Sequence, residues 1–319
     1  MPQNKPVVGI DLGGTNMQIA IVSPERAIMG RSKRKTKPDD GRDAVIARIA
    51  EGVQEACDDA KVPIGEIAGL GIGAPGAIEP AQGVVLEAVN LRWTDVPLAD
   101  ILRKRLNMPA FVDNDVNVAV YAENVMGAGE QSRDLLGVWI GTGIGGGLIL
   151  NGALYYGAFF SAGEIGHTIL FPGVPLGSRS LEHNCSRTAV VDRIVRLLRS
   201  NRKSVIPSLV DGDLDQVKSK TVAKAYQMGD ELTMQVVDHV ADLLGIAIAN
   251  AVTLLSLPRV VLGGGLTEAM GEPLVERVKK SARANVFPDK CRQVKIVATR
   301  LLDDAGALGA ALIAQDRLG

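Results

Sequence analysis

A strand that runs into a glycine-rich turn and then into a second strand occurs twice in this chain, and this repeat constrains the fold more than any other feature. Near the N-terminus, the apolar segments 6–12 and 17–23 flank the turn DLGGTN at 11–16. In the second half, the apolar segments 135–140 and 147–150 flank GTGIGGG at 141–147. Short apolar runs bounded by glycines are typical of strands. Two such hairpins indicate a duplicated unit.

The rest of the chain alternates between helical and strand patterns. The segment Arg42–Ala60 is amphipathic, with Val45, Ile46, Ile49 and Val53 at helical spacing. The other predicted elements are, in order, a strand at 67–72, a glycine- and proline-rich loop at 73–80, a helix at 97–106, a strand at 110–112, helices from about 116 and at 232–255, a strand at 259–262 and a small-residue helix at 305–316. This alternation predicts an α/β layer structure, in which we expect the last helix to return to the first domain.

Length and charge limit the classes of protein to consider. The 319 residues suffice for two domains, and we expect residues 1–118 with 303–319 in one and 119–302 in the other. A net charge of -1 argues against a nucleic-acid partner. The basic run Arg31–Lys37 is interpreted as a solvated hairpin or loop before a helix, with an acidic-partner patch as the alternative.

Cysteine usage and hydropathy point to the cytoplasm. Cys57, Cys185 and Cys291 are few and widely spaced, which fits a reducing compartment. The N-terminal segment has no signal-peptide pattern, and no apolar run approaches the roughly 20 residues of a membrane span. We therefore expect a cytoplasmic protein without a membrane partner.

The glycine turns are candidate phosphate-binding loops, because paired glycines let backbone amides approach an anion. A plain hairpin turn is the alternative for DLGGTN. GTGIGGG matches the dinucleotide-binding spacing GxGxxG, but the apolar segment after it predicts a strand, whereas that motif requires a helix. A third glycine cluster, at 263–265 between a predicted strand and a predicted helix, could leave room for the adenosine part of a nucleotide. The candidate nucleotide-binding residues are Asp11, which could also hold a hydrated Mg²⁺, Gly13, Gly14, Thr15, Asn16, Gly141, Thr142, Gly143, Gly263, Gly264 and Gly265.

Polar residues follow the strand at 110–112 and suggest acid–base chemistry. A helix N-cap would account for Asp115 or Asn117, but not for the whole set Asp113, Asn114, Asp115 and Asn117. Asp115, at a strand end between two phosphate loops, is a candidate general base. Further on, Glu164, His167 and Glu182 suit hydrogen bonding to neighbouring hydroxyls, although a structural histidine is the commoner case.

These motifs, in this order, resemble the ROK family of repressors, open reading frames and kinases, and most of all its glucokinases. The resemblance covers nearly the whole chain, from DLGGT through GAPG at 73–76, Asn90-Leu91 with Trp93, Asn114-Asp115, GTGIGGG and GEIGH at 163–167 to GGG at 263–265 and AGALGA at 305–310. It implies the ribonuclease-H-like, actin- and hexokinase-type ATPase fold, with two α/β domains flanking a cleft for sugar and ATP.

The resemblance also implies roles for individual residues. Asp115 would take the proton of the attacking hydroxyl, Mg²⁺ and the glycine-turn amides would stabilise the transferring phosphoryl group, and domain closure would exclude water. The residues expected at the sugar are Gly76, Asn90, Asn114, Asp115, Glu164, His167 and Glu182. Relatives imply a homodimer or a larger even homo-oligomer.

One segment departs from the family pattern. Many members hold a structural zinc with one histidine and a CxCGxxGC run, but residues 173–181 here contain no cysteine, so we expect no structural zinc site. Cys185, His183 and His167 would make an incomplete substitute. Either packing around Leu176 and Leu181 replaces the metal, or the loop that presents Glu182 is mobile without sugar.

Several functions remain open on the sequence alone. The leading hypothesis is a hexose kinase that converts glucose to glucose 6-phosphate. Fructose, mannose, allose or an N-acetylhexosamine is an alternative acceptor, and a catalytically decayed sugar-binding regulator is another alternative. A transcriptional repressor of the same family is disfavoured, because the first phosphate turn begins at Asp11 and leaves no room for a preceding winged helix.

Overall fold

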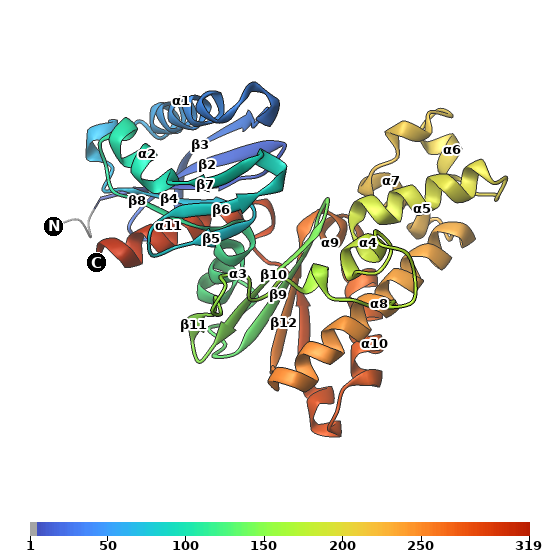
Figure 1. The fold of residues 1–319 in the computed structure, drawn as a ribbon. Coiled ribbons are helices and arrows are strands. Elements are labelled where there is room, and N and C mark those ends of the chain that lie inside the picture. The colour runs from blue at the N-terminus through green and yellow to red at the C-terminus, as the bar shows by residue number, and fades with distance from the viewer. Residues whose placement is uncertain (1–4) are drawn as a thin grey trace. The chain divides into compact units, whose positions relative to one another are not determined.

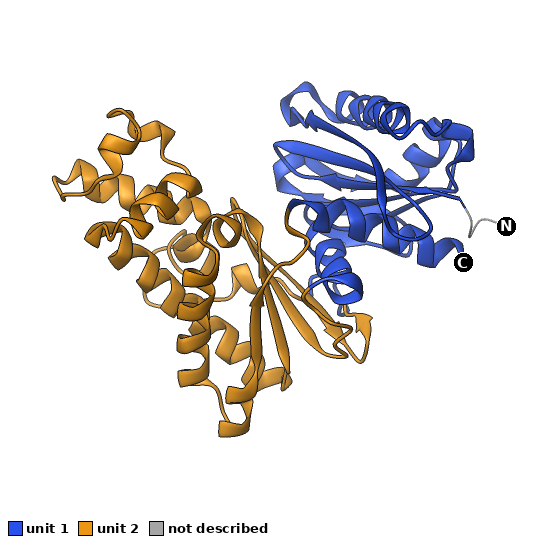
Figure 2. Ribbon diagram, turned by 180° about the vertical axis from the view of Figure 1, so that it is seen from behind, with its two compact units in different colours: residues 1–127, 156–162, 303–319 blue, residues 128–155, 163–302 orange. Residues whose placement is uncertain are grey.

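The chain divides into two compact units in the computed structural model, which describes residues 5–319. Unit 1 runs over Met1–Gly127, Tyr156–Ala162 and Asp303–Gly319, and unit 2 over Ala128–Tyr155 and Gly163–Leu302 (Figure 2). The domain assignment expected from the sequence stays a prediction. Its proposed boundary at residue 118 falls inside the helix α3 (Asp115–Met126).

Unit 1 is built on a five-stranded sheet with the order β3-β2-β1-β4-β8 (Figure 1). The first three strands are β1 (Val7–Leu12), β2 (Asn16–Val22) and β3 (Ile28–Lys35), and they form an antiparallel meander. β4 (Leu70–Ala74) and β8 (Ala110–Asn114) then add in parallel to β1. The carboxyl ends of β1, β4 and β8 therefore lie at one edge of the sheet.

Helices pack on this sheet, and glycines allow one of them to approach closely. α1 (Arg42–Ala60) contacts β2 and β3, and α2 (Leu98–Leu106) contacts β8. The last helix, α11 (Ala305–Leu318), contacts β1 and β4, which confirms that it returns to the first unit. A Cβ at Gly9 of β1 would lie 1.9 Å from the carbonyl oxygen of Ala307, so only glycine permits this packing.

A three-stranded sheet follows β4, where the sequence predicted only a loop at 73–80. Its strands are β5 (Ala77–Glu79), β6 (Val84–Ala88) and β7 (Trp93–Val96), with the short 3₁₀ turn η4 (Val89–Leu91) between the last two. The loop prediction was therefore wrong for β5. Strands this short carry too few residues to establish an alternating pattern.

Unit 2 repeats the strand order of unit 1, as β11-β10-β9-β12-β13 (Figure 1). Its strands are β9 (Leu135–Ile140), β10 (Ile144–Leu150), β11 (Ala153–Leu154), β12 (Arg259–Gly263) and β13 (Lys295–Ala298). β9–β11 are antiparallel, and β12 and β13 add in parallel. The predicted duplication is thus present. β10 begins earlier than predicted, because Gly145–Gly147 pair with residues 137–139 of β9.

The helices of unit 2 include a long apolar one, α8 (Glu231–Leu255). By length and composition it could cross a membrane, yet 61% of its most apolar window is buried within the described residues. It packs against helices that the chain places on either side of it in sequence: α4 (Leu181–Cys185), α5 (Arg187–Arg199), α7 (Ser219–Gln227) and α10 (Glu272–Asn285). Two shorter helices complete the unit, α6 (Ile206–Leu209) and α9 (Gly264–Met270).

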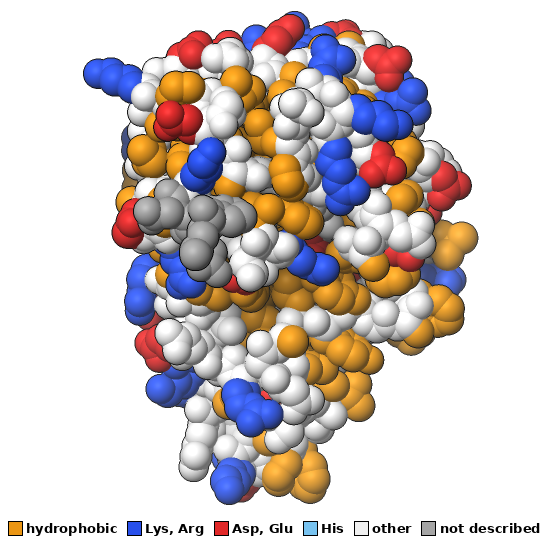
Figure 3. Space-filling model, turned by 90° about the vertical axis from the view of Figure 1, so that its left-hand side faces the viewer, with side chains coloured by type: hydrophobic (Ala, Val, Ile, Leu, Met, Phe, Trp, Pro, Cys, Tyr) orange, Lys and Arg blue, Asp and Glu red, His pale blue; other side chains and the backbone are white. Residues whose placement is uncertain are grey.

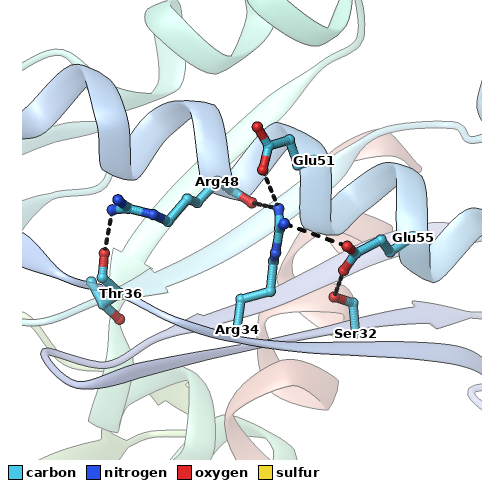
Figure 4. Close-up of polar contacts among 6 residues, drawn as sticks. All are labelled: Ser32, Arg34, Thr36, Arg48, Glu51 and Glu55. Carbon is cyan, nitrogen blue, oxygen red and sulfur yellow. Dashed lines mark hydrogen bonds and ion pairs between the residues drawn. The ribbon is translucent and has the colours of Figure 1, made fainter. Parts of the chain in front are cut away.

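The basic run Arg31–Lys37 lies mostly in β3, the outer strand of the β2–β3 hairpin. Of the two structures expected for this run, the hairpin is therefore correct and the loop is wrong. Arg34 forms ion pairs with Glu51 at 2.5 Å and Glu55 at 3.4 Å, and Ser32 donates to Glu55 (Figure 4). α1 thereby neutralises part of the strand's charge. On the face drawn in Figure 3, Lys and Arg side chains are interspersed with Asp and Glu.

Candidate active-site residues

The first glycine turn is tied down through its carbonyl groups. Thr36 donates its hydroxyl to the carbonyl oxygen of Gly13 at 2.6 Å and its N–H to that of Thr15 at 2.9 Å. The carbonyl of Thr36 accepts a bond from Arg48 (Figure 4). Within residues 5–319, the N–H groups of Gly13, Gly14 and Thr15 donate no hydrogen bond. Such an unpaired run of amides is what an anion-binding turn requires.

Asp11 lies in β1 just before this turn, and its carboxyl group is half-buried against α11. A Cβ at Gly306 would lie 2.6 Å from the Asp11 carboxyl carbon. Burial, followed by the charges of Asp115 and Asp303, raises the pKa of Asp11 to about 7, and Lys33 opposes this rise. Two carboxylates, Asp11 and Asp115, therefore act on each other at this edge of the sheet.

Oxygen ligands of this kind suit Mg²⁺, which usually takes one or two carboxylates together with water and substrate phosphates. In the described part of the chain, no three His, Cys, Asp or Glu side chains form a metal-holding group. At this edge of the sheet, Asp11 and Asp115 are the carboxylates that could hold such an ion.

The β8–α3 junction explains the polar cluster that follows the strand. Asn114, not Asp115 or Asn117 as expected, is the N-cap of α3, and its Oδ1 accepts from the N–H groups of Val116 and Asn117. Its Nδ2 donates to the carbonyl oxygen of Gly76 at 3.0 Å. This leaves Asn114 one N–H for a ligand.

Asp115 is the first residue of α3, and its Oδ1 accepts from the N–H of Val116 at 2.9 Å. A Cβ at Gly73 would lie 3.1 Å from the Asp115 Cα, so the glycine at the end of β4 makes room for this helix start. Asp115 therefore stands at the carboxyl edge of the sheet, where ligands of open α/β sheets bind.

Asp113 is structural rather than part of the open site. Its side chain is buried and accepts from the Tyr156 hydroxyl at 2.6 Å and from the N–H of Asn114 at 2.7 Å. Burial raises the pKa of Asp113, and these hydrogen bonds oppose the rise. Tyr156 was missed in the sequence because nothing local links it to β8, which lies about 40 residues earlier.

Gly76 and Asn90 lie on the small sheet beside the first turn. Gly76 has φ 95°, and a Cβ there would lie 2.0 Å from the carbonyl oxygen of Glu87. The Cβ of Asn90, an exposed residue of η4, would be 3.1 Å from a Cβ at Gly14. Unit 1 therefore brings its predicted sugar and phosphate residues together, except that Asn16 lies within β2 and pairs with Lys35.

In the second glycine turn, as in the first, the carbonyl groups accept hydrogen bonds and some of the N–H groups stay unpaired. The carbonyl oxygens of Gly141, Thr142 and Gly143 accept from the Arg187 N–H, the Thr188 hydroxyl and the Gly141 N–H, each at 2.9 Å. The N–H groups of Thr142 and Gly143 donate no hydrogen bond to any described residue. Unit 2 thus presents a second set of unpaired amides.

The third glycine cluster is explained mainly by packing. A Cβ at Gly263 would lie 2.5 Å from the Trp139 ring, and one at Gly264, where φ is 84°, 2.7 Å from the backbone N of Ile140. Gly265 is different, because the nearest atom to a Cβ there would be Nη1 of Arg187 at 3.8 Å. Only Gly265 borders open space that a nucleotide could use.

The predicted sugar residues of unit 2 gather beside the second turn. Glu182 accepts from the N–H of Ile144 at 2.7 Å, and its Oε2 would lie 2.2 Å from a Cβ at Gly143. Burial raises the pKa of Glu164, while His167 lowers it and Glu182 raises it. The Nε2 of His167 lies 3.9 Å from the Glu164 carboxylate.

The cysteine-free loop before Glu182 is closed by backbone hydrogen bonds. Ile169 and Ser180 form a β-bridge, and the N–H of Leu181 donates to the carbonyl oxygen of Thr168 at 2.9 Å. Leu181 is buried, but Leu176 is 83% exposed, so the expected packing around Leu176 is wrong. Cys185 is buried, which raises the pKa of its thiol to about 12.

Comparison with known proteins confirms the resemblance seen in the sequence. The chain matches the ROK family over residues 7–317. It is 35% identical to a glucokinase of Thermotoga maritima, with both chains covered in full, and 32% identical to a glucokinase of Halalkalibacterium halodurans, over 95% of this chain and 92% of that one. Its fold is similar to that of a ROK family glucokinase from Streptomyces griseus in complex with glucose and AMPPNP, at a TM-score of 0.87 and 29% identity, with 98% and 99% of the two chains covered. The chain belongs to the ROK family and has the actin- and hexokinase-type ATPase fold.

Proposed function

We propose that this ROK-family chain is an ATP-dependent hexose kinase that converts glucose to glucose 6-phosphate, with Asp115 as the general base. The observation that carries the proposal is the pair of glycine turns, each with its carbonyls tied and its amides unpaired, because such turns suit the phosphates of a nucleotide. The acceptor follows from the glucokinases that the chain resembles.

Asp115 would accept the proton of the attacking sugar hydroxyl as the oxygen bonds to the γ-phosphorus of ATP, with ADP leaving. Phosphoryl transfer depends mostly on positioning and on neutralising charge. The amides of Gly13–Thr15 and of Thr142 and Gly143 would donate to phosphate oxygens, and their preorganised orientation would avoid reorganisation during the reaction.

Mg²⁺, when bound with ATP, would neutralise phosphate charge, and Asp11 would hold it through water, with Asp115 nearby. The raised pKa of Asp11 supports this role. Burial and the charge of Asp115 destabilise the ionised form of Asp11, and a neighbouring cation would stabilise that form.

The sugar would be bound by the remaining N–H of Asn114 and by Asn90 and Gly76 in unit 1. Glu164, His167 and Glu182 would supply acceptors and a donor from unit 2. Because Glu182 already accepts from Ile144, it would bind the sugar with its remaining lone pairs.

A coupled ADP-release assay with MgATP and a hexose panel tests this function. We expect glucose to give the highest kcat/KM among glucose, mannose, fructose, allose and the N-acetylhexosamines. Preference for another hexose would retain the kinase and replace its substrate. Binding of sugar or ATP without turnover would favour the decayed regulator and contradict the proposal.

We also propose a homodimer or larger even assembly in the cytoplasm. Leu254 and Phe287, which are 82% and 74% exposed, lie near each other in unit 2, where the N–H of Phe287 donates to the Thr253 hydroxyl. Exposed apolar side chains of this kind favour subunit contacts. Light scattering with size-exclusion chromatography measures the mass, and a monomer at micromolar concentration would contradict this part.

A further inference from the structure

Arg187, which no motif singled out, lies between the two glycine clusters of unit 2. It is the first residue of α5, and its backbone N–H donates to the carbonyl oxygen of Gly141. Its Nη2 donates to the hydroxyl of Thr142 at 2.7 Å, and its Nη1 would lie 3.8 Å from a Cβ at Gly265. One guanidinium group therefore borders both the second turn and the one open position of the third cluster.

The charge of this guanidinium is not used inside the protein. Among residues 5–319, Arg187 forms no ion pair with a carboxylate, and the first turn of α5 contains no acidic residue. The charge of Arg187 also does not stabilise α5, because the helix macrodipole disfavours a cation at the N-terminus. A half-buried arginine without an anionic partner has donors left for a ligand.

The hydroxyl of Thr142 fixes the direction of the side chain. It accepts one of the five guanidinium N–H groups, while the Thr188 hydroxyl holds the Thr142 carbonyl. Planar guanidinium groups bind phosphate through two parallel hydrogen bonds, which a lysine cannot reproduce. A preoriented guanidinium beside unpaired amides has the chemistry of a polyphosphate site.

We propose that Arg187 binds the polyphosphate of the nucleotide, together with the amides of Thr142 and Gly143. The inference rests on the proposed kinase function and assigns to unit 2 a cation that the glycine motifs do not contain. Thr142 then acts as the positioning residue that aims the guanidinium.

Steady-state kinetics of Arg187→Gln test the proposal, with Arg196→Gln as the matched control because Arg196 is an exposed arginine of the same helix. Loss of charged hydrogen bonds should raise the KM for ATP by about 10- to 100-fold and leave the KM for glucose within about twofold. Arg187→Lys should recover part of the loss, and Arg196→Gln should match the wild type.

Inhibition by ADP and by adenosine separates phosphate binding from a structural role. We expect Arg187→Gln to weaken ADP inhibition in parallel with the KM for ATP and to leave adenosine inhibition unchanged. An unchanged KM for ATP, or an equal loss of ADP and adenosine inhibition, would overturn the proposal for Arg187. Absence of hexose phosphorylation by the wild type would instead overturn the proposed function.

Discussion

The Gly13–Thr15 turn of unit 1 and the Gly141–Gly143 turn of unit 2 join equivalent strands of the same five-stranded topology, but different side chains hold them. In unit 1, one residue, Thr36, ties two carbonyls from the far end of β3. In unit 2, Arg187 and Thr188 tie the turn from the start of a helix. Both turns nevertheless have unpaired N–H groups, so this backbone arrangement does not depend on which residues bind the carbonyl groups.

The charged groups beside the two turns differ. The first turn follows Asp11, with Asp115 close enough to raise its pKa, whereas the second borders a cation, the guanidinium of Arg187, as well as the carboxylate of Glu182. An acidic edge suits a metal ion and a general base, and a cation suits phosphate. The duplicated fold thus supplies two similar glycine turns, and the charged residues beside each turn determine whether it suits a metal ion and a general base or a phosphate group.

The largest expected effect distinguishes the acidic edge. Asp115→Asn keeps an oxygen for the Val116 N–H but cannot accept a proton, so kcat should fall by about 10²- to 10⁴-fold while the KM for glucose changes little. Asp43→Asn, at an exposed helix position, is the control. Near wild-type turnover of Asp115→Asn would remove this carboxylate from the mechanism.

A smaller effect tests whether the second turn and Glu182 act as one unit. A Cβ at Gly143 would lie 2.2 Å from Oε2 of Glu182, so Gly143→Ala should displace the carboxylate and lower kcat/KM for glucose by roughly 10- to 100-fold. Gly141→Ala, where the nearest atom would be 3.9 Å away, should be tolerated. Adding Glu182→Gln to Gly143→Ala should cost little more. Full additivity of the two changes would show that they act separately.

The pKa of Asp11 makes stability depend on pH in unit 1. Between its ordinary value of 3.8 and about 7, the folded protein keeps a proton that the unfolded chain releases, so the free energy of unfolding falls as pH rises. Asp11→Asn lacks this titration and should exceed the wild type by about 2 kcal/mol at pH 8, less than the full shift implies because Asp11 keeps some contact with solvent.

Denaturant titrations at pH 4 and pH 8, without nucleotide, measure this difference. The two proteins should be closest in stability at pH 4, and millimolar Mg²⁺ should narrow the gap at pH 8 if Asp11 holds the ion. A difference that is the same at both pH values would contradict the raised pKa.

The sequence predicts the duplicated hairpins, α1 and the long apolar helix α8 because each carries a strong local pattern. The N-cap was harder to predict, since Asn114, Asp115 and Asn117 are all capping types, and Asn114 is distinguished only by the bonds that its Oδ1 accepts from the N–H groups of Val116 and Asn117. Thr36 and Arg187 could not be found, because their partners lie about 20 and 45 residues away in sequence. The sequence also cannot distinguish glycines that are needed for packing from glycines that bind phosphate. Gly263 and Gly264 are of the first kind, because they make room for residues of β9.

The smallest expected effect compares the two anchors directly. The Thr36 hydroxyl is fully buried, so Thr36→Val leaves the carbonyl of Gly13 without its partner and should cost about 1 kcal/mol of unfolding free energy and raise the KM for ATP a few-fold. Thr188 is exposed, and water can replace its hydroxyl at Thr142, so Thr188→Val should cost less than about 0.5 kcal/mol. Thermal denaturation and ATP kinetics of the two variants measure the contrast. Equal losses would mean that burial does not distinguish the anchors, and that both turns depend on their tied carbonyls to the same extent.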